Sequence, residues 1–361
     1  MKSPDKSNEL RSILKQELGG NLARMTLMSF LITSMLKVRS VNFARLAAGY
    51  HNGANHSSKL RRIQRFFCQF EFTEPLYCRL LAKMLPVQGR YQLSLDRTNW
   101  KLGRLNINLL FLSVIYQGVS LPIFWCVLGD KRGNSSQQER IRLLEQFIKY
   151  FGQDKIDALT ADREFVGNAW LCFLSMNQIR FYIRVRKNMY FTYRDGKRVK
   201  AYWLLLSQPL NQAYFHPKIV YLQDTLVYFS GMKYMARGGK VEYLIIVAFN
   251  EKHLSVEVYR NRWQIEMMFK AFKSAGFNLE ATHINDYQRL DRLIKVLAIA
   301  FIWAYNTGIY LHEQVKKIPL KKHGRRAQSF FSYGLNYLSQ ALINTVHEMM
   351  YKAITLFLSC T

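Results

Sequence analysis

The spacing of apolar residues changes along the chain from a helical pattern to a strand pattern. Up to residue 85, apolar positions recur every three to four residues, which predicts helices over 21–36, 40–50 and 57–70. From Arg90 onward, alternation and short apolar runs predict strands. These strands cover 91–97, 106–116, 119–128, 156–161 and 178–185, with helices expected over 135–151 and 166–176. A mixed α/β core therefore follows a helical region.

Two later stretches have patterns of their own. Between 187 and 251, short aromatic and β-branched runs are separated by Asp195-Gly196 and by Gly238-Gly239, which predicts hairpins. Residues 293–311 are apolar enough to approach the length of a membrane span. They contain Lys295 and Asn306 and directly follow a charged stretch, so a buried core helix is the favoured interpretation.

Between these two stretches, residues 258–273 form an amphipathic pattern that predicts a helix. Tyr259, Arg262, Glu266 and Lys273 share one arc of it, because separations of three, seven and fourteen residues are close to whole helical turns. All four side chains can therefore face one site. The alternative for this pattern alone is a surface helix with a solvated charged edge.

Two aspartates accompany the expected strands. Asp96 lies in the strand predicted over 91–97, and Asp162 directly follows the strand predicted over 156–161. Each one alone also fits a turn former or a helix cap. Together with Glu266, however, they supply three carboxylates from two strands and a helix, an oxygen-ligand set suited to hard divalent cations. Two such ions about 4 Å apart serve in-line phosphoryl transfer.

The spacing of Tyr259, Arg262, Glu266 and Lys273 reproduces the YREK signature of bacterial DDE transposases of the insertion sequence 4 family. The chain also resembles that family around Asp96, in Leu-Asp-Arg-Thr-Asn-Trp-Lys, and around Asp162, in Asp-Arg-Glu-Phe. The resemblance spans roughly residues 50–310 and keeps the family's order of the three acids. It implies a ribonuclease-H-like catalytic core interrupted by a β-rich insertion, with helical N-terminal and C-terminal regions.

The resemblance also implies a domain organisation. We expect a helical N-terminal DNA-binding region, a first part of the core, a β-rich insertion, a second part of the core that carries the signature helix, and a helical C-terminal region. Their expected ranges are 1–85, 86–186, 187–251, 252–314 and 315–361.

The same resemblance implies an activity. The three acids would hold two Mg²⁺ or Mn²⁺ ions, and the enzyme would bind terminal inverted repeats, cut them through a DNA hairpin and join them to target DNA as a homodimer assembled on DNA. Arg262 and Lys273 would hold phosphates, and Tyr259 a phosphate or a sugar. The family captures an unstacked base on a Trp in the last strand of the insertion, where this chain has Tyr243.

The charge of the chain agrees with a DNA partner. Lys and Arg number 52 against 24 Asp and Glu, a formal net charge of +28, as expected for a protein that binds a polyanion. On the helix predicted over 57–70, a basic edge suited to phosphate contact comprises Lys59, Arg61, Arg62 and Arg65. A solvated face is the alternative for that edge. A membrane surface also attracts basic proteins, but here the basic residues are spread over the whole length.

Cysteine usage and the N-terminus bear on location. The five cysteines are odd in number and include no Cys-x-x-Cys pair, so neither a disulfide framework nor a thiolate zinc site is indicated. Residues 1–17 are polar and show no secretory signal. We therefore expect a cytoplasmic protein, and the family resemblance implies a bacterial one associated with the nucleoid.

Three other functions remain compatible with the sequence. A metal-dependent nuclease of the same fold would keep the acids but lack strand transfer. A catalytically silent DNA-binding descendant would be expected to have lost an acid, and all three are present. A basic membrane-associated protein would depend on residues 293–311.

Overall fold

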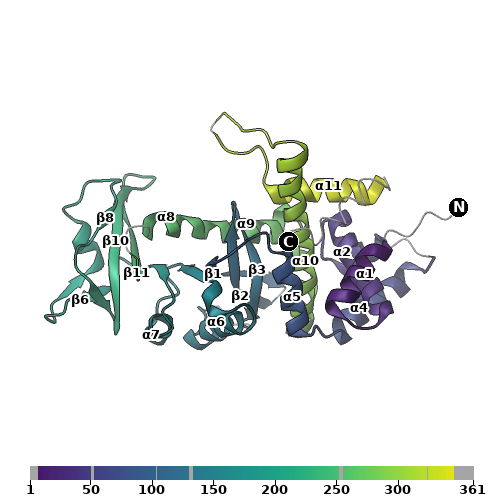
Figure 1. Cartoon of the computed structure of the whole chain (residues 1–361), viewed down its shortest axis with the longest axis horizontal. Coiled ribbons are helices and arrows are strands. Elements are labelled where there is room, and N and C mark those ends of the chain that lie inside the picture. The colour runs from purple at the N-terminus through teal and green to yellow at the C-terminus, as the bar shows by residue number, and fades with distance from the viewer. Residues whose placement is uncertain are drawn as a thin grey trace. The chain divides into compact units, whose positions relative to one another are not determined.

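The structure is a computed structural model that describes residues 7–49, 53–102, 104–129, 133–251, 255–322 and 324–344 (Figure 1). The chain divides into two compact units. One, here called the sheet unit, comprises residues 87–99 and 108–266. The other, the helical unit, is drawn from residues 1–86, 100–107 and 267–361.

Asparagines begin three helices of the helical unit. The side chain of Asn21 accepts from the Ala23 N–H, that of Asn42 from Ala44 and Arg45, and that of Asn55 from Ser58, as expected of N-caps. The helices predicted over 21–36, 40–50 and 57–70 are confirmed as α2, α3 and α4, and α3 is shorter because its cap lies at Asn42. The helices of this unit are α1 (Ser7–Leu18), α2 (Leu22–Val38), α3 (Phe43–Ala48), α4 (His56–Gln69), α5 (Glu74–Met84), α10 (Tyr287–Tyr310) and α11 (Phe330–Asn344).

Helix α10 is the centre of the helical unit. It is long and apolar enough to cross a membrane, but 89% of its most apolar window is buried inside the protein, as in a core helix. It crosses α11 at two glycines, where a Cβ on Gly308 would collide with the Phe330 carbonyl and one on Gly334 with the Ala304 carbonyl. The two backbones therefore approach too closely for side chains at these positions. The expected C-terminal helical region is described as far as residue 344, and residues 345–361 lie outside the described part.

The sheet unit is built on β1 (Tyr91–Leu102), β2 (Leu105–Tyr116), β3 (Val119–Val127), β4 (Ile156–Ala161) and β5 (Phe181–Arg184). Their order is β3-β2-β1-β4-β5. Strands β2 and β3 pair antiparallel, whereas β1 with β4 and β4 with β5 pair parallel. This arrangement confirms the expected ribonuclease-H-like core. Strand β1 continues past the predicted end at residue 97, because alternating burial persists through Thr98 and Trp100.

Two sequence features shape the sheet edge at β3, one in the turn before the strand and one within it. Gln117 and Gly118, predicted as a turn, have φ of 42° and 99° and close the β2–β3 hairpin. Pro122 lies opposite Ser113 at a register shift in the pairing. Proline lacks an N–H donor and is tolerated at a bulge on an edge strand, which is the position of β3.

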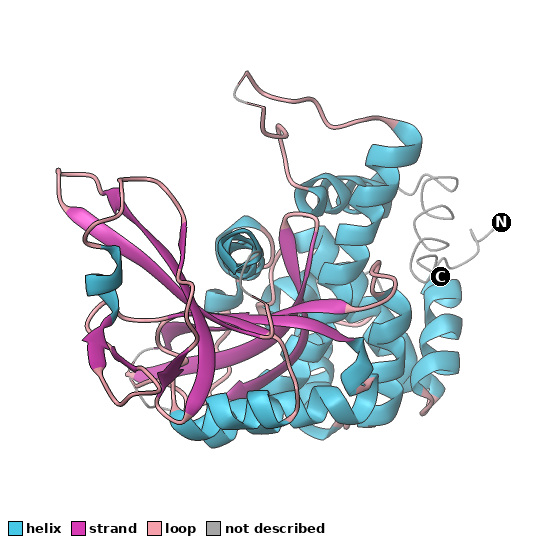
Figure 2. Cartoon of the chain, turned by 60° about the vertical axis from the view of Figure 1, so that its left-hand side comes forward, coloured by secondary structure: helices cyan, strands magenta, loops and turns pink. Residues whose placement is uncertain are grey.

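Helices cover both faces of this sheet (Figure 2). Helices α6 (Gln137–Phe151) and α7 (Asn168–Met176) lie on one face and α8 (Ser255–Arg260) on the other. Val256 and Tyr259 of α8 pack with Ala158 of β4 and Tyr182 of β5 in one buried cluster. This packing carries one residue of the predicted signature against the strand that precedes Asp162.

The insertion extends the same sheet. Strand β11 pairs antiparallel with β5, so the sheet reaches eleven strands. The predicted hairpin turns are confirmed: Gly196, Gly238 and Gly239 have φ of 84°, 93° and 76°, values that L side chains rarely adopt. The added strands are β6 (Tyr190–Thr192), β7 (Arg198–Lys200), β8 (Tyr214–Phe215), β9 (Val220–Leu222), β10 (Thr225–Met235) and β11 (Val241–Phe249).

The sequence predicted one regular helix over 258–273, but the structure shows a succession of short helices and turns there. Helix α8 passes into a 3₁₀ turn at Asn261–Trp263, then into α9 (Gln264–Lys270) and a π turn at Ala271–Ala275. Polar side chains in and next to the 3₁₀ turn make hydrogen bonds with β1 and with the β2–β3 turn. The Asn261 amide donates to Gln92, and the Gln264 side chain accepts from the Gly118 N–H at 2.8 Å.

Candidate active site

Two aspartates meet at one edge of the sheet. Leu95 of β1 pairs with Ala161 of the parallel strand β4, so the next residues, Asp96 and Asp162, are neighbours. Because the two strands pair in parallel register, the residues that follow Leu95 and Ala161 lie side by side. The two acids that the sequence singled out are therefore adjacent.

Arg262 connects the first acid to the third. Its guanidinium donates to Asp96 Oδ2 at 2.6 Å and to Glu266 Oε1 at 2.8 Å. The Arg262 and Asp96 side chains are only 13% and 15% exposed, whereas Glu266 is 59% exposed. The pair with Asp96 is shielded from water and is the stronger contact. Arg262 thereby gathers Asp96 and Glu266 around one positive charge.

The second acid, Asp162, is contacted by Tyr259 and by Arg184, a residue that sequence reasoning missed. The Tyr259 hydroxyl donates to Asp162 Oδ1 at 3.2 Å, and Arg184 lies 4.0 Å from the same oxygen. Burial raises the pKa of Tyr259 well above its usual value, so the hydroxyl stays a neutral donor. Arg184 is the last residue of β5, the strand next to β4, and that placement at the strand end was the available signal.

The first acid, Asp96, has a raised pKa. Burial raises the pKa of Asp96 from 3.8 to about 6, while Arg262 and the backbone N–H of Arg97 act in the opposite direction. The neighbouring charges of Asp162 and Glu164 raise it further. A carboxyl group that is desolvated beside other acids gains most from a bound cation, because that cation relieves both causes.

A second ion pair lies beside these acids and was also missed from the sequence. Arg97 donates from Nε to Glu164 Oε1 at 2.7 Å. These residues follow Asp96 by one position and Asp162 by two, within the two motifs that the sequence singled out. The ion pair ties the segment after β4 to β1 next to the acids.

The oxygen ligands of the three acids suit a divalent ion, although the three side chains are not grouped closely enough to share one. In the part of the chain that the structure describes, no group of three or more His, Cys, Asp or Glu side chains is placed to hold a metal. Arg262 supplies the positive charge between Asp96 and Glu266. Carboxylate oxygens are the ligands that Mg²⁺ and Mn²⁺ prefer, so the chemistry of these residues fits such an ion.

Lys273, the last residue of the predicted signature, belongs to the helical unit. It lies in the π turn, where its ammonium group is 3.0 Å from Glu280 Oε1 and 5.8 Å from the ring centroid of Trp100. The structure brings Tyr259, Arg262 and Glu266 together with the aspartates. It places Lys273 beside Glu280 and Trp100.

Tyr243, the predicted base-stacking residue, lies on β11 within an aromatic and basic patch. Its ring is 5.8 Å from Tyr202, and the Lys187 ammonium lies 6.0 Å from its centroid. Trp203, 47% exposed, adjoins Tyr202 and has Lys200 over its ring at 5.8 Å. Sequence reasoning missed Tyr202 and Trp203 because they lie about forty residues before Tyr243.

The predicted basic edge lies on α4 in the helical unit. Ile63, Phe66 and Phe67 of this helix are buried, whereas Arg61 and Arg65 are exposed. Lys59 and Arg62 are half-buried on the same helix. The exposed part of the basic edge is available to an anionic partner.

Comparison with known proteins identifies a family for this chain. A family model described as the transposase DDE domain matches residues 87–303, more than half of the chain. No curated protein matches the chain significantly. Among solved structures, the chain is similar to the piggyBac transposase in the cryo-EM structure of its synaptic complex with hairpin DNA. That alignment has a TM-score of 0.47 and 12% sequence identity and covers 97% of this chain and 79% of the other.

Proposed function

The chain belongs to the transposase DDE domain family, and on this premise we propose that it is a cut-and-paste DNA transposase of the insertion sequence 4 type. DDE transposases generally use divalent metal ions. In this proposal the enzyme binds the terminal inverted repeats of an insertion sequence, cuts them through a hairpin and joins the freed ends to target DNA.

One observation carries the proposal. Asp96 within β1 and Asp162 directly after β4 are neighbours on adjacent parallel strands, and Arg262 links Asp96 to Glu266. Arg262 binds the first and third of these acids, and Tyr259, three residues before it, binds the second, so three acids from separate segments make a site for transferring a phosphoryl group. A helix with a solvated charged edge would not bury Arg262 against Asp96.

Each side chain has an assigned role. Two Mg²⁺ or Mn²⁺ ions held by Asp96, Asp162 and Glu266 would activate the attacking oxygen and stabilise the leaving oxygen. Tyr259 keeps Asp162 oriented through its hydroxyl. Arg262, whose planar donors suit a phosphate, would be a partner for DNA when the ions occupy the acids.

Other residues hold the DNA. Lys273 and the basic edge of α4 bind phosphates, which matches the net charge of +28. Tyr243 stacks on the base that leaves the helix when a hairpin forms, and its neighbours Tyr202 and Lys187 widen that surface. Because two ends are cut and joined, the active form is a homodimer assembled on DNA in the bacterial cytoplasm.

A strand-transfer assay tests this function. Purified protein is incubated with Mg²⁺, a labelled duplex that ends in the inverted repeats flanking the gene, and a supercoiled plasmid. We expect nicked, hairpin and fully cut donor species, followed by donor joined to plasmid. A parallel reaction with a duplex of scrambled ends controls for end recognition.

Two outcomes would contradict the proposal. Cutting without joined product would make the chain a nuclease of the same fold. Absence of cutting in the presence of specific end binding would make it a DNA-binding protein without catalysis.

A further inference from the structure

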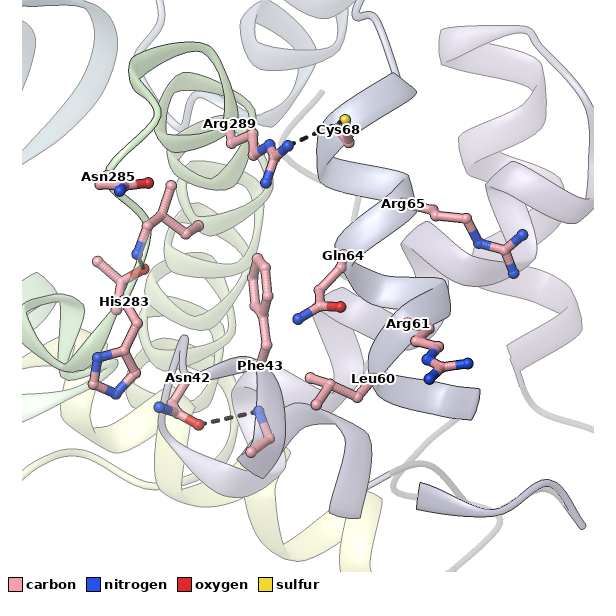
Figure 3. Close-up of a pocket in the computed structure, with 13 residues that line it drawn as sticks. Asn42, Phe43, Leu60, Arg61, Gln64, Arg65, Cys68, His283, Asn285 and Arg289 are labelled. Atoms are coloured by element: carbon pink, nitrogen blue, oxygen red, sulfur yellow. Dashed lines mark hydrogen bonds between the residues drawn. The ribbon is translucent and has the colours of Figure 1, made fainter. Parts of the chain in front are cut away.

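A groove of about 970 Å³ opens in the helical unit (Figure 3). One wall is formed by α3 and α4, and the other by residues 282–285 with the first turn of α10. None of these residues belongs to the carboxylate site, which lies in the sheet unit. The active-site chemistry therefore does not account for the groove.

An aromatic ring lies in the middle of the groove. Phe43 stacks on the buried Phe67 with ring centroids 5.0 Å apart and planes 10° apart, and Figure 3 shows its ring between the two walls. Phe43 is half-buried, so it contributes surface to the lining while Phe67 supports its other side. Leu60 and Ile284 add apolar surface beside it. A supported ring of this kind is suited to stacking against a flat partner.

The rim of the groove is basic. Arg61, Arg65 and Arg289 line it and are exposed, the Arg61 and Arg65 side chains extending outward from α4 in Figure 3, and the described residues of the lining include no carboxylate. Arg289 is held at the rim, since its Nη2 lies 3.4 Å from Cys68 Sγ of α4. Three guanidinium groups without a nearby acid in the lining attract an anionic occupant.

Polar side chains also line the groove, on both of its walls. Gln64, His283 and Asn285 line the groove and are exposed, and Figure 3 shows Gln64 directed toward its middle. Amide and imidazole groups offer both donors and acceptors, which match the edges of nucleobases. The groove therefore combines surfaces for a base face, a base edge and phosphates.

We propose that this groove binds a short unpaired stretch of DNA, with a base stacked on Phe43 and its phosphates held by Arg61, Arg65 and Arg289. An intact duplex stacks its bases on one another and offers no free base face to a ring at the floor of a groove. Unpaired DNA offers that face, and base–aromatic stacking with a basic rim is how single strands are bound without strict sequence preference.

The inference rests on the proposed function only for the origin of the strand, because cutting at a DNA end provides unpaired nucleotides. Binding itself needs no cutting. Full-length protein carrying Asp96→Ala is therefore titrated into a fluorescently labelled single strand and, separately, into the matching duplex, and anisotropy is followed at several salt concentrations.

Three substitutions in that background locate the bound strand. Phe43→Leu keeps an apolar contact with Phe67 but removes the stacking ring, and should weaken single-strand binding roughly 5- to 100-fold. Arg289→Gln should weaken it and reduce the slope of log affinity against log salt by about 0.7. Ala44→Glu places a carboxylate at an exposed position of the lining without removing a buried group, and should also weaken binding.

Arg45→Gln is the matched control, because Arg45 is an exposed arginine of α3 that does not line the groove. Its affinity for the single strand should stay within about twofold of the parent's, because the lost charge has only a small effect. The proposal is overturned if Ala44→Glu and Arg289→Gln bind like the Arg45→Gln control. It is also overturned if the parent prefers the duplex and all groove variants lose duplex and single strand equally. Normal single-strand binding by a chain that never cuts DNA would refute the proposed function alone.

Discussion

Replacement of Arg262 by Gln should cost stability in a way that depends on pH. Arg262 is the cation between Asp96 and Glu266, and the pair with Asp96 is shielded from water. Without it, Asp96 is left as a buried carboxylate with no opposite charge beside it. Such a group takes up a proton when ionisation becomes too unfavourable, so protonation sets an upper limit on the loss.

The magnitude follows from the pKa of Asp96, which is about 6 with Arg262 present. At pH 8, two pH units above this pKa, protonating Asp96 in the parent costs about 3 kcal/mol. This is close to the largest loss of folding stability that the variant can suffer through Asp96. At pH 5 most Asp96 is already protonated in the parent, so the variant should lose under about 1 kcal/mol. The contact with the exposed Glu266 adds at most about 0.5 kcal/mol.

Thermal unfolding at pH 5 and pH 8 measures this difference. The Arg262→Gln variant should unfold several degrees below the parent at pH 8 and much closer to it at pH 5. Mg²⁺ should raise the midpoint of the variant more than that of the parent, because no guanidinium competes for the acids. Arg180→Gln is the control, since Arg180 pairs with Asp157 at 3.7 Å with both groups exposed, and should change little. An equal loss at both pH values would refute the reasoning.

Three further outcomes are expected. Burial raises the pKa of Asp96, so its protonated form is favoured in the fold and stability should fall by up to about 3 kcal/mol as pH rises from about 4 to above 6; Asp96→Asn should remove this fall in thermal scans. Gly334→Ala should destabilise by about 2 kcal/mol or more through contact with the Ala304 carbonyl, whereas Gly53→Ala, with nothing within 4 Å, should be close to neutral in the same scans. Tyr243→Ala should permit the first nick but reduce the hairpin on a labelled end, and Tyr243→Trp should preserve it; equal hairpin yield in Ala and parent would make Tyr243 an ordinary strand residue.

Local patterns were enough to locate the strands that carry the acids. Strand β4 has the predicted ends at Ile156 and Ala161, and the β2–β3 turn lies at Gln117-Gly118. Both features are encoded by neighbouring residues: a short apolar run, and a pair that adopts positive φ. Because Asp96 and Asp162 follow from these strands, their proximity was predictable once parallel pairing was assumed.

Contacts between distant segments were not predictable in this way. The helical wheel for 258–273 assumed a uniform angle per residue, which the 3₁₀ and π turns change along that segment. Arg184 reaches Asp162 only because β5 pairs with β4. The groove joins Phe43 to residues 282–285, and no periodic pattern relates positions so far apart in sequence.

Cleavage of a labelled terminal repeat by the single variants Asp96→Ala, Asp162→Ala and Glu266→Ala tests the assignment of the acids most directly. Each variant should bind the repeat nearly as the parent does, because the basic surfaces grip the phosphates, but none should nick it. The parent should cut with Mg²⁺ or Mn²⁺ and not with Ca²⁺, which tolerates looser geometry. Full cleavage by Glu266→Ala, or cleavage by the parent without a divalent ion, would contradict the account.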